Sequence, residues 1–331
     1  MPESASIRAI DLFCCAGGSS WGAQSAGVTI VAGFDQWELA GRNFSANFAD
    51  ASFHLGRLED LDPEEIAKDL GRIDLIIASP ECTNHSPAKG DKPRSEQSKE
   101  TAFQVVRFAS VLRPRWIVIE NVVSMRHWSR YKEFKGQLED LGYNVREEVL
   151  NSSDFGVPQK RTRLFLVCDR EAMPTRTPRR RGRKRGAASF VSMNGAYGWS
   201  RLRAKGRARA TLKRARRAVR AVGSESPFLM VYYGSDGAGG WQRLSSPLRT
   251  VTTLDRFAVV KPSEKGHLMR MLQVPELQAA MGMEEMQLPC GTRRERIHMV
   301  GNAVCPPVMA EVVKHLTREA NKDYDIKPRT N

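Results

Sequence analysis

Short apolar runs recur through the first half of the chain, separated by stretches with helical spacing of apolar residues. The pattern KETAFQVVRFASVLRP, for example, places Phe103, Val106 and Val111 on one helical face and stops at Pro114. Alternating strands and helices are typical of a parallel sheet covered by helices on both faces. The predicted fold class is therefore α/β, with strands at SIRAIDLF, VTIVAGF, IDLIIA, RWIVIE and RTRLFLV.

This alternation stops after Cys168, where the composition becomes strongly basic. Residues 170–223 hold 18 Lys and Arg residues and one acidic residue, Glu171. We therefore expect a sheet domain over 1–167, a smaller domain over 168–294 that contains the basic segment, and a return to the first domain over 295–331. The pattern does not indicate internal repeats.

The basic segment has two parts. RTPRRRGRKRG (176–186) is too polar to form a core, and we expect a mobile, solvated loop. RLRAKGRARATLKRARRAVRAVG (201–223) predicts a helix with a thin apolar stripe at Leu212, Ala215, Val219 and Val222. Such a surface suits a polyanion, although a solvated face or a localisation tract would look the same in sequence.

The composition narrows the class of protein. No apolar run approaches the roughly 18 residues that span a bilayer, and MPESASIRAI lacks the layout of a secretory signal, so we expect a cytoplasmic protein. The six cysteines form no CxxC pair. Neither disulfides nor a metal site is expected.

Chemically distinctive residues follow the predicted strands. The first predicted strand ends in DLFCCAGGSSWG, and the second ends at Asp35. Cys82 follows the third predicted strand, and Glu120 lies at the end of the fourth. Carboxyl ends of strands are where open α/β sheets bind ligands. Each feature has an ordinary alternative: a tight turn, a helix cap, an inert thiol or an ion pair. Their joint occurrence favours a site that combines a nucleotide-like ligand, a thiol and a carboxylate.

The segments DLFCCAGG, FD, SPEC, ENV, QKRTR and GNAVCPP occur in this order between Asp11 and Val308. Together they resemble the S-adenosylmethionine-dependent DNA cytosine-5 methyltransferases. The resemblance implies a Rossmann-like methyltransferase sheet that binds the cofactor, and a smaller basic domain that recognises the target. It also implies double-stranded DNA as partner and, in some systems, a cognate restriction endonuclease. We expect a monomer.

The resemblance also assigns roles to residues. Cys82 would add to carbon 6 of a cytosine flipped out of the duplex, so that carbon 5 can accept a methyl group. Glu120 would contact ring nitrogen 3, Arg163 the ring carbonyl oxygen, and Arg161 would support the loop. Residues 83–97 would form a lid. The expected cofactor contacts are Phe13, Ala16, Gly17, Gly18, Asp35, Gln36, Trp37, Pro80, Asn302 and Val304. The expected DNA contacts are Ser86, Arg179, Arg180, Arg181, Arg183, Lys184 and Arg185.

Several positions depart from the family pattern. Cys15 replaces a usual glycine, Gln36 a common adenine-stacking aromatic, and Arg57 a frequent acidic residue. Glu81 replaces the proline before the nucleophile, and Cys305 another proline. Three alternatives therefore stay open: an RNA cytosine-5 methyltransferase, an inactive DNA-binding relative, and transfer of an extended carbon unit. The missing GxGxxG pattern disfavours a nicotinamide or flavin oxidoreductase.

Overall fold

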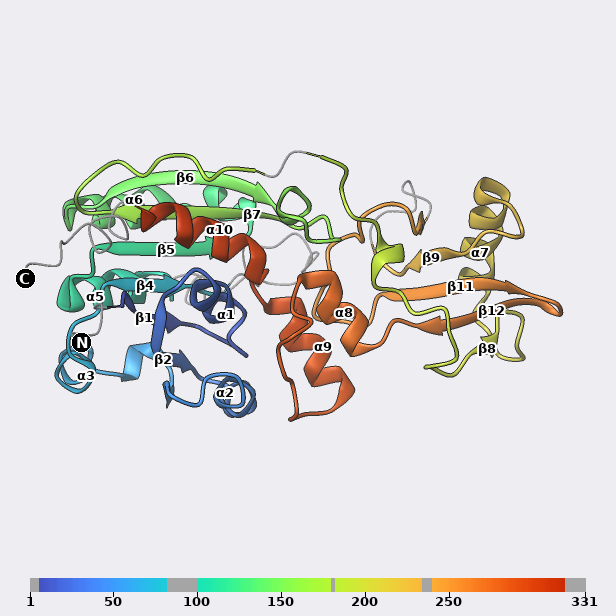
Figure 1. Ribbon diagram of the computed structural model, residues 1–331, viewed down its shortest axis with the longest axis horizontal. Helices are drawn as coiled ribbons and strands as arrows, with labels where there is room; N and C mark the ends of the chain where they lie inside the picture. Colours follow the sequence, from blue (N-terminus) through green and yellow to red (C-terminus); the bar gives the residue numbers. More distant parts are fainter. Residues whose placement is uncertain (1–5, 82–100, 180–181, 234–239, 319–331) are drawn as a thin grey trace, which may run out of the picture.

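The molecule has two lobes that follow each other along its long axis, the first built on a seven-stranded sheet and the second on a five-stranded sheet (Figure 1). The computed structural model describes residues 6–81, 101–179, 182–233 and 240–318. Over these ranges, none of the helices combines the length and the apolar character that crossing a membrane requires.

The large sheet has the strand order β3-β2-β1-β4-β5-β7-β6. Neighbouring strands from β3 to β5 run parallel, whereas β7 is antiparallel to both β5 and β6. The strands are β1 (Arg8–Leu12), β2 (Thr29–Asp35), β3 (Ser52–Leu55), β4 (Leu75–Ala78), β5 (Trp116–Asn121), β6 (Asn144–Asn151) and β7 (Thr162–Asp169).

The predicted α/β class is confirmed, but the expectation of a wholly parallel sheet was wrong at RTRLFLV. This run forms β7, and the chain reaches it from the edge strand β6 through a short connection. Short connections join antiparallel neighbours, since parallel neighbours need a longer crossover. The sequence analysis missed β6 because this edge strand mixes buried with partly exposed positions and shows no continuous apolar run.

Helices cover both faces of the large sheet, as predicted. One face carries α3 (Pro63–Leu70), α5 (Phe103–Leu112) and α6 (Tyr131–Asp140). The other face carries α1 (Gly18–Ser25), α2 (Glu38–Ser45) and the last helix, α10 (Pro306–Leu316). Helix α10 packs against α1 at Gly22, where a Cβ atom would lie 2.5 Å from the Pro306 carbonyl oxygen. The C-terminal segment therefore returns to the first lobe (Figure 1).

The small sheet has the order β10-β9-β11-β12-β8, and all of its strand pairs are antiparallel. Its elements are β8 (Ser200–Arg201), α7 (Arg209–Val222), β9 (Phe228–Val231), β10 (Trp241–Arg243), β11 (Phe257–Ser263) and β12 (Gly266–Met271). The predicted stripe of α7 is confirmed, since Ala215 is buried and Leu212, Val219 and Val222 pack around it. The helix begins later than expected because residues 200–201 pair with β12 and Gly206 turns the chain with a φ of 82°.

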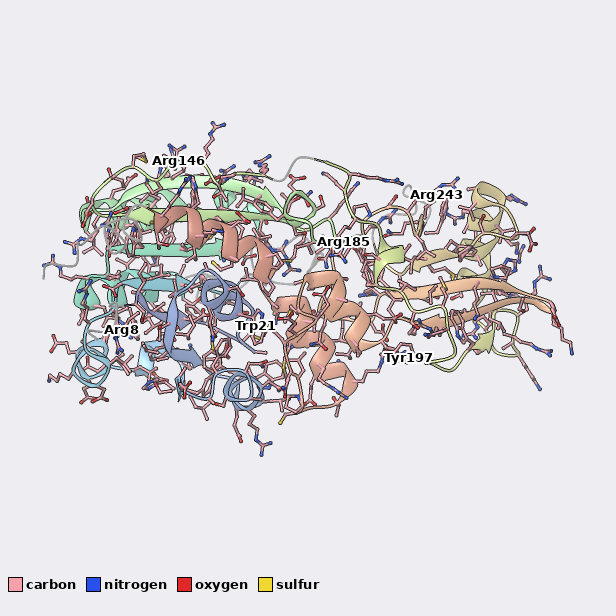
Figure 2. All side chains as sticks on the ribbon, viewed as in Figure 1. Arg8, Trp21, Arg146, Arg185, Tyr197 and Arg243 are labelled. Carbon is pink, nitrogen blue, oxygen red and sulfur yellow. The ribbon has the colours of Figure 1, made fainter. Side chains whose placement is uncertain are left out.

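The described parts of the tract 176–186, residues 176–179 and 182–186, make specific contacts with the first lobe. Thr177 is buried, and its backbone N–H and hydroxyl both donate to the Glu148 carboxylate on β6. Lys184 lies 2.8 Å from Asp154, and Figure 2 shows Arg185 at the junction of the two lobes. The expected solvated loop agrees with the exposed side chains of Arg176, Arg179 and 182–185, while its mobility stays a prediction. Composition alone does not reveal the contacts with Glu148 and Asp154.

Two helices, α8 (Val274–Met281) and α9 (Arg293–Asn302), lie between the two sheets (Figure 1). The short helix η4 (Ser152–Phe155) follows β6 and packs against α10 in the first lobe. A buried ion pair fixes α8 to the small sheet, since Arg270 on β12 lies 2.6 Å from Glu276 and both side chains are 3% exposed. The predicted domain bounds at 167 and 294 stay a prediction.

Arg161, just before β7, joins segments that lie far apart in the sequence. Its side chain is buried, and its guanidinium donates to the carbonyl oxygens of Val251, Gly301 and Ala303, each at 3.0 Å. Gln159 reinforces the junction because its amide donates to Ala280 and accepts from the Val251 N–H, both at 3.2 Å. The residues just before β7 are therefore hydrogen-bonded both to the end of α9 and to the second lobe at Val251.

Asp11, near the carboxyl end of β1, is fully buried. Its Oδ2 accepts the hydroxyl protons of Ser19, at 2.5 Å, and of Ser20, at 2.6 Å, while Oδ1 has no partner. Burial raises the pKa of Asp11 from 3.8 to about 7, against the lowering effect of the two hydroxyls. A carboxyl whose folded pKa lies above its unfolded value binds a proton more tightly in the folded state.

Replacement of Arg161 by Met keeps most of the side-chain volume but leaves three buried carbonyl groups without donors. We therefore expect the free energy of unfolding to fall by about 3–5 kcal/mol. Urea denaturation of the wild type, Arg161→Met and the exposed control Arg176→Met measures this. The control should stay within about 0.5 kcal/mol. Equal effects of the two substitutions would contradict the assigned role of Arg161.

The second prediction concerns Asp11. Because its pKa rises on folding, its contribution to stability is complete below pH 3.8 and is lost as the pH rises to about 7. Unfolding free energies of the wild type and Asp11→Asn, compared at about pH 5 and about pH 8, test this. The variant should gain stability relative to the wild type at the higher pH. A difference that does not change with pH would show that Asp11 is ionised throughout.

Candidate active site

The carboxyl ends of β1, β2, β4 and β5 surround a pocket of about 610 Å³. The chain leaves β1 toward β2 on one side and later adds β4 on the other, so the pocket lies at the switch point of the sheet. Its volume is within the range of small-molecule sites. The topology therefore places the pocket where the sequence analysis expected a ligand.

The loop after β1 forms the floor of the pocket. Phe13 and Cys15 adopt positive φ angles of 61° and 48°, and Gly17 follows at 89°, so the chain turns sharply into α1. A Cβ atom on Gly18 would lie 2.7 Å from the Val304 carbonyl oxygen. Only glycine allows this approach. Phe13 lines the pocket, whereas Ala16, Gly17 and Gly18 are buried behind its lining.

Asp35 forms the second wall. Its Oδ2 accepts the backbone N–H of Cys15 and its Oδ1 that of Trp37, both at 2.9 Å. Burial raises the pKa of Asp35, and these backbone donors oppose the rise. The carboxylate thus orders both neighbouring loops and also faces the pocket, together with Gln36 and Trp37. The alternative that Asp35 only caps a helix accounts for part of this arrangement, since its carboxylate also accepts from Cys15 in the loop after β1.

Two hydrogen bonds fix the loop after β4. The Ser79 hydroxyl donates to the Phe13 carbonyl, and the Asn121 side chain donates to the Pro80 carbonyl, both at 3.0 Å. The chain at Pro80, two residues before Cys82, is therefore held between the ends of β1 and β5. Cys82, Ser86, Arg180, Arg181 and the expected lid at 83–97 lie outside the described residues.

Glu120 at the end of β5 is 7% exposed and lines the pocket. Arg163 on β7 lies next to it, with Nε 3.0 Å from Oε1 of Glu120. Burial raises the pKa of Glu120, and the nearby guanidinium groups of Arg163 and Arg161 lower it. A carboxyl balanced in this way can exchange or share a proton with a ring nitrogen, while the arginines stabilise charge around it.

The end of α9 closes the pocket from the second lobe's side. His298, Asn302 and Val304 line it, and the His298 ring meets the Trp37 ring edge to face, with 5.3 Å between centroids. Burial lowers the pKa of His298, and Arg294 lowers it further. The sequence analysis missed His298, although its position four residues before Asn302 on a helix was a usable signal.

Other lining residues were missed because neither their side-chain type nor the family pattern gave them a role, although Cys14, Ser79 and Ala303 lie within the family segments. Arg57 and Glu81, noted above only as departures from the family pattern, also line the pocket, and Arg57 forms an ion pair with Glu59 at 3.7 Å. The remaining missed residues are Cys14, Cys15, Ser19, Gly56, Leu58, Glu59, Ser79, Thr101 and Ala303. Cys15 and Ser19 had been quoted within the glycine loop, without a role.

The charges of the lining match a cationic ligand without phosphate. The described lining contains the carboxyl groups of Asp35, Glu59, Glu81 and Glu120, and Arg57 is its one permanent cation. A nucleoside with an aromatic base and a sulfonium would find an acidic group at β2, the Trp37 and Phe13 rings, and surrounding carboxylates. The residues present therefore fit S-adenosylmethionine better than a nucleoside phosphate.

The comparisons with known proteins agree with this geometry. The family model described as C-5 cytosine-specific DNA methylase matches residues 7–318. The chain is 30% identical over 161 residues to the Type II methyltransferase M.HindV of Haemophilus influenzae, an alignment that covers 49% of this chain and 52% of the relative. It is 33% identical over 162 residues to M.MthTI of Methanothermobacter thermautotrophicus, covering 48% of each. The chain spans about half the length of the curated relatives it matches.

Solved structures share the fold. The methyltransferase EhMeth of Entamoeba histolytica superposes with a TM-score of 0.69 at 15% identity, over 95% of this chain and 99% of the other. A putative DNA modification methyltransferase from an E. coli prophage gives a TM-score of 0.65 at 17% identity, over 96% and 100%. Since the family model covers nearly the whole described chain, this protein belongs to the C-5 cytosine-specific DNA methylase family.

Proposed function

We propose that this chain is a DNA cytosine-5 methyltransferase that uses Cys82 as its nucleophile. The observation that carries the proposal is the Glu120–Arg163 ion pair: Glu120 lines the pocket together with Pro80, Arg163 lies behind Glu120, and Asn121, the residue after Glu120, holds the Pro80 carbonyl. This arrangement puts a proton-sharing carboxyl and a cation next to the segment that leads into Cys82. S-adenosylmethionine is the methyl donor of this family.

The proposed reaction begins with the Cys82 thiolate. It adds to carbon 6 of cytosine, and the ring electrons move so that carbon 5 becomes nucleophilic. Carbon 5 would then take the methyl group from the sulfonium of S-adenosylmethionine held in the pocket beside Asp35, with S-adenosylhomocysteine as the leaving group. Loss of the carbon 5 proton then allows the Cys82–carbon 6 bond to break and the thiolate to depart. The cytosine must leave the duplex to reach this pocket.

Glu120 and Arg163 have complementary parts in this scheme. Glu120 hydrogen-bonds or protonates ring nitrogen 3, which takes up the charge that arrives with the thiolate. Arg163 contacts the ring carbonyl oxygen, and Arg161 holds the start of β7 in place through its three carbonyl partners. Breaking the Arg163–Glu120 ion pair when the base enters would free both groups for these contacts.

The proposed cofactor contacts follow from the pocket lining. The Asp35 carboxylate would accept hydrogen bonds from the ribose hydroxyl groups, and the Phe13 and Trp37 rings would pack on the base. Gln36, Pro80, Asn302 and Val304 complete the enclosure. Ala16, Gly17 and Gly18 would act through the backbone shape of the loop, since they are buried behind the lining.

Double-stranded DNA is the proposed substrate because the relatives in the comparison are Type II methyltransferases and the small lobe is strongly basic. Arg179, Arg183, Lys184 and Arg185 are exposed and can contact phosphates. Arg179 donates to the Val149 carbonyl on β6, and Figure 2 shows Arg185 at the lobe junction. Ser86, Arg180 and Arg181 remain proposed contacts from the sequence. The same sequence basis suggests a cognate restriction endonuclease as a partner.

Nucleoside analysis tests the proposed function. The chain is expressed in cells that lack cytosine methylation, their DNA and RNA are digested, and the nucleosides are identified by mass spectrometry. We expect 5-methylcytosine in DNA, its loss with Cys82→Ala, and its retention with the matched control Cys290→Ala. Modification confined to RNA would overturn the DNA substrate, and a different cytosine adduct would overturn plain methyl transfer.

Glu120→Gln removes the acidic proton but keeps the size of the side chain. Because general acid catalysis contributes about 10²- to 10⁴-fold, we expect turnover to fall by that factor while cofactor affinity stays within about twofold. Methyl transfer to duplex DNA and calorimetric binding of S-adenosylmethionine measure the two quantities. Glu147→Gln on β6 is the matched control. Full activity of Glu120→Gln would remove this residue from the mechanism.

Asp35→Asn tests the ribose contact. Hydrogen bonds to a charged group contribute about 1.5–3 kcal/mol, so the dissociation constant of S-adenosylmethionine should rise about 10- to 100-fold. The measurement is calorimetric titration of the purified protein, with thermal unfolding as a check on the loops that Asp35 orders. Unchanged affinity in a variant of unchanged stability would exclude this carboxylate from the cofactor site.

A further inference from the structure

Helix α7 carries a one-sided row of cations outside the pocket. Arg209, Lys213, Arg216 and Arg220 are all exposed and follow one another at spacings of four, three and four residues. This spacing puts them on one face of a helix. The row extends for about 16 Å at 1.5 Å per residue. We call it the α7 stripe.

The α7 stripe has no acidic counterpart. Residues 200–222 contain ten Lys and Arg residues and no Asp or Glu. Among the residues that the structure describes, no carboxylate pairs with Arg209, Lys213, Arg216 or Arg220. Like charges four residues apart repel each other on a helix, and Arg209 in the first turn opposes the helix dipole. The helix therefore carries an electrostatic cost that a polyanion would relieve.

Helices of the first lobe are organised differently. On α2, Glu38 faces Arg42 at 3.8 Å, and on α6, Lys135 faces Glu139 at 3.5 Å. Such mixed pairs are what an ordinary solvated helix surface shows. The absence of acidic residues on α7 is therefore a feature of this helix and not of the whole surface.

The rest of the small lobe holds α7 with the stripe facing outward. Ala215 and Ala218 pack on one face of the small sheet, against Phe228 and Met230. The opposite face of the same strands, with Leu229 and Val259, joins the core shared with the first lobe. Arg243 on β10, labelled in Figure 2, donates to the Ala221 carbonyl in the last turn of α7 at 2.9 Å.

The position of α7 separates the stripe from the pocket. The helix covers the side of the small sheet that faces away from the core shared with the first lobe, and Figure 1 shows it at the far end of the molecule from the large sheet. A duplex whose flipped base enters the pocket could meet the stripe only with a part that lies beyond the target. Exposed Arg201, Arg203 and Lys205 lead up to the helix and extend the positive surface.

We propose that the α7 stripe binds the phosphates of duplex DNA outside the target site and so anchors the protein on long DNA. This inference rests on the proposed function, because it takes DNA as the substrate. Phosphate contacts of this kind carry no sequence information, and each phosphate neutralised releases condensed counterions. The contribution of the stripe must therefore be independent of sequence, strongly salt-dependent and greater on longer duplexes.

The test compares two variants with the same change in net charge. In the first, Arg209, Lys213, Arg216 and Arg220 are all replaced by Gln, which keeps helix propensity. In the matched control, Arg42, Lys68, Lys132 and Lys314 of the first lobe are replaced by Gln; these side chains are exposed and lie outside the pocket lining. Binding to duplexes of about 12 and about 40 base pairs, roughly 41 and 136 Å long at 3.4 Å per pair, is measured at several salt concentrations.

We expect the stripe variant to bind the long duplex about 10-fold or more weakly, and its salt slope to fall by about 3.6, at roughly 0.9 for each of four lost phosphate contacts. It should bind and methylate the short duplex like the wild type, which also shows that it is folded. The control variant should match the wild type on both duplexes. Equal losses on both lengths, or no loss on the long duplex, would overturn the inference and leave the proposed function standing. A wild type that binds and methylates neither duplex would overturn both.

Discussion

The buried guanidinium of Arg161 is the contact on which the arrangement of the site depends. It satisfies three carbonyl groups, from one segment of the second lobe and from the end of α9. A buried charge is tolerated only when its hydrogen bonds are made, and here those bonds connect parts of the chain up to 142 residues apart. Because α9 delivers Asn302 and Val304 to the pocket, the same contact that joins the lobes also closes the site.

The remaining walls of the pocket are assembled by shorter connections of the same kind. Asp35 binds the loops after β1 and β2, Ser79 binds the ends of β1 and β4, and Asn121 binds the ends of β4 and β5. Asp35 and Ser79 order these loops and also line the pocket. Asn121 orders its loop and lies next to Glu120, which lines the pocket. Preorganisation of this type lets electrostatic stabilisation act without rearrangement during the reaction.

Sequence reasoning succeeded where a residue's type and its place at a strand end were sufficient. The buried strands, Asp35 and Glu120 could be recognised from apolar runs and from the residues that follow them. It failed where a partner elsewhere in the fold decides the outcome. The half-polar edge strand β6 gave no apolar run, the direction of β7 depended on β6, and the hydrogen bonds of Thr177 depended on Glu148. His298 entered the pocket only through the packing of α9 on Trp37.

The proposed covalent bond between Cys82 and cytosine can be detected with a mechanism-based trap. A duplex that contains 5-fluorocytosine at the target position carries no proton on carbon 5 to be lost, so the adduct cannot resolve. Incubation with S-adenosylmethionine, followed by digestion and peptide mass spectrometry, locates the bond. We expect a cytosine adduct on the peptide that contains Cys82, and we expect it to form only when S-adenosylmethionine is present. Methylation of normal DNA without any trapped adduct, or an adduct on Cys14 or Cys15, would contradict it.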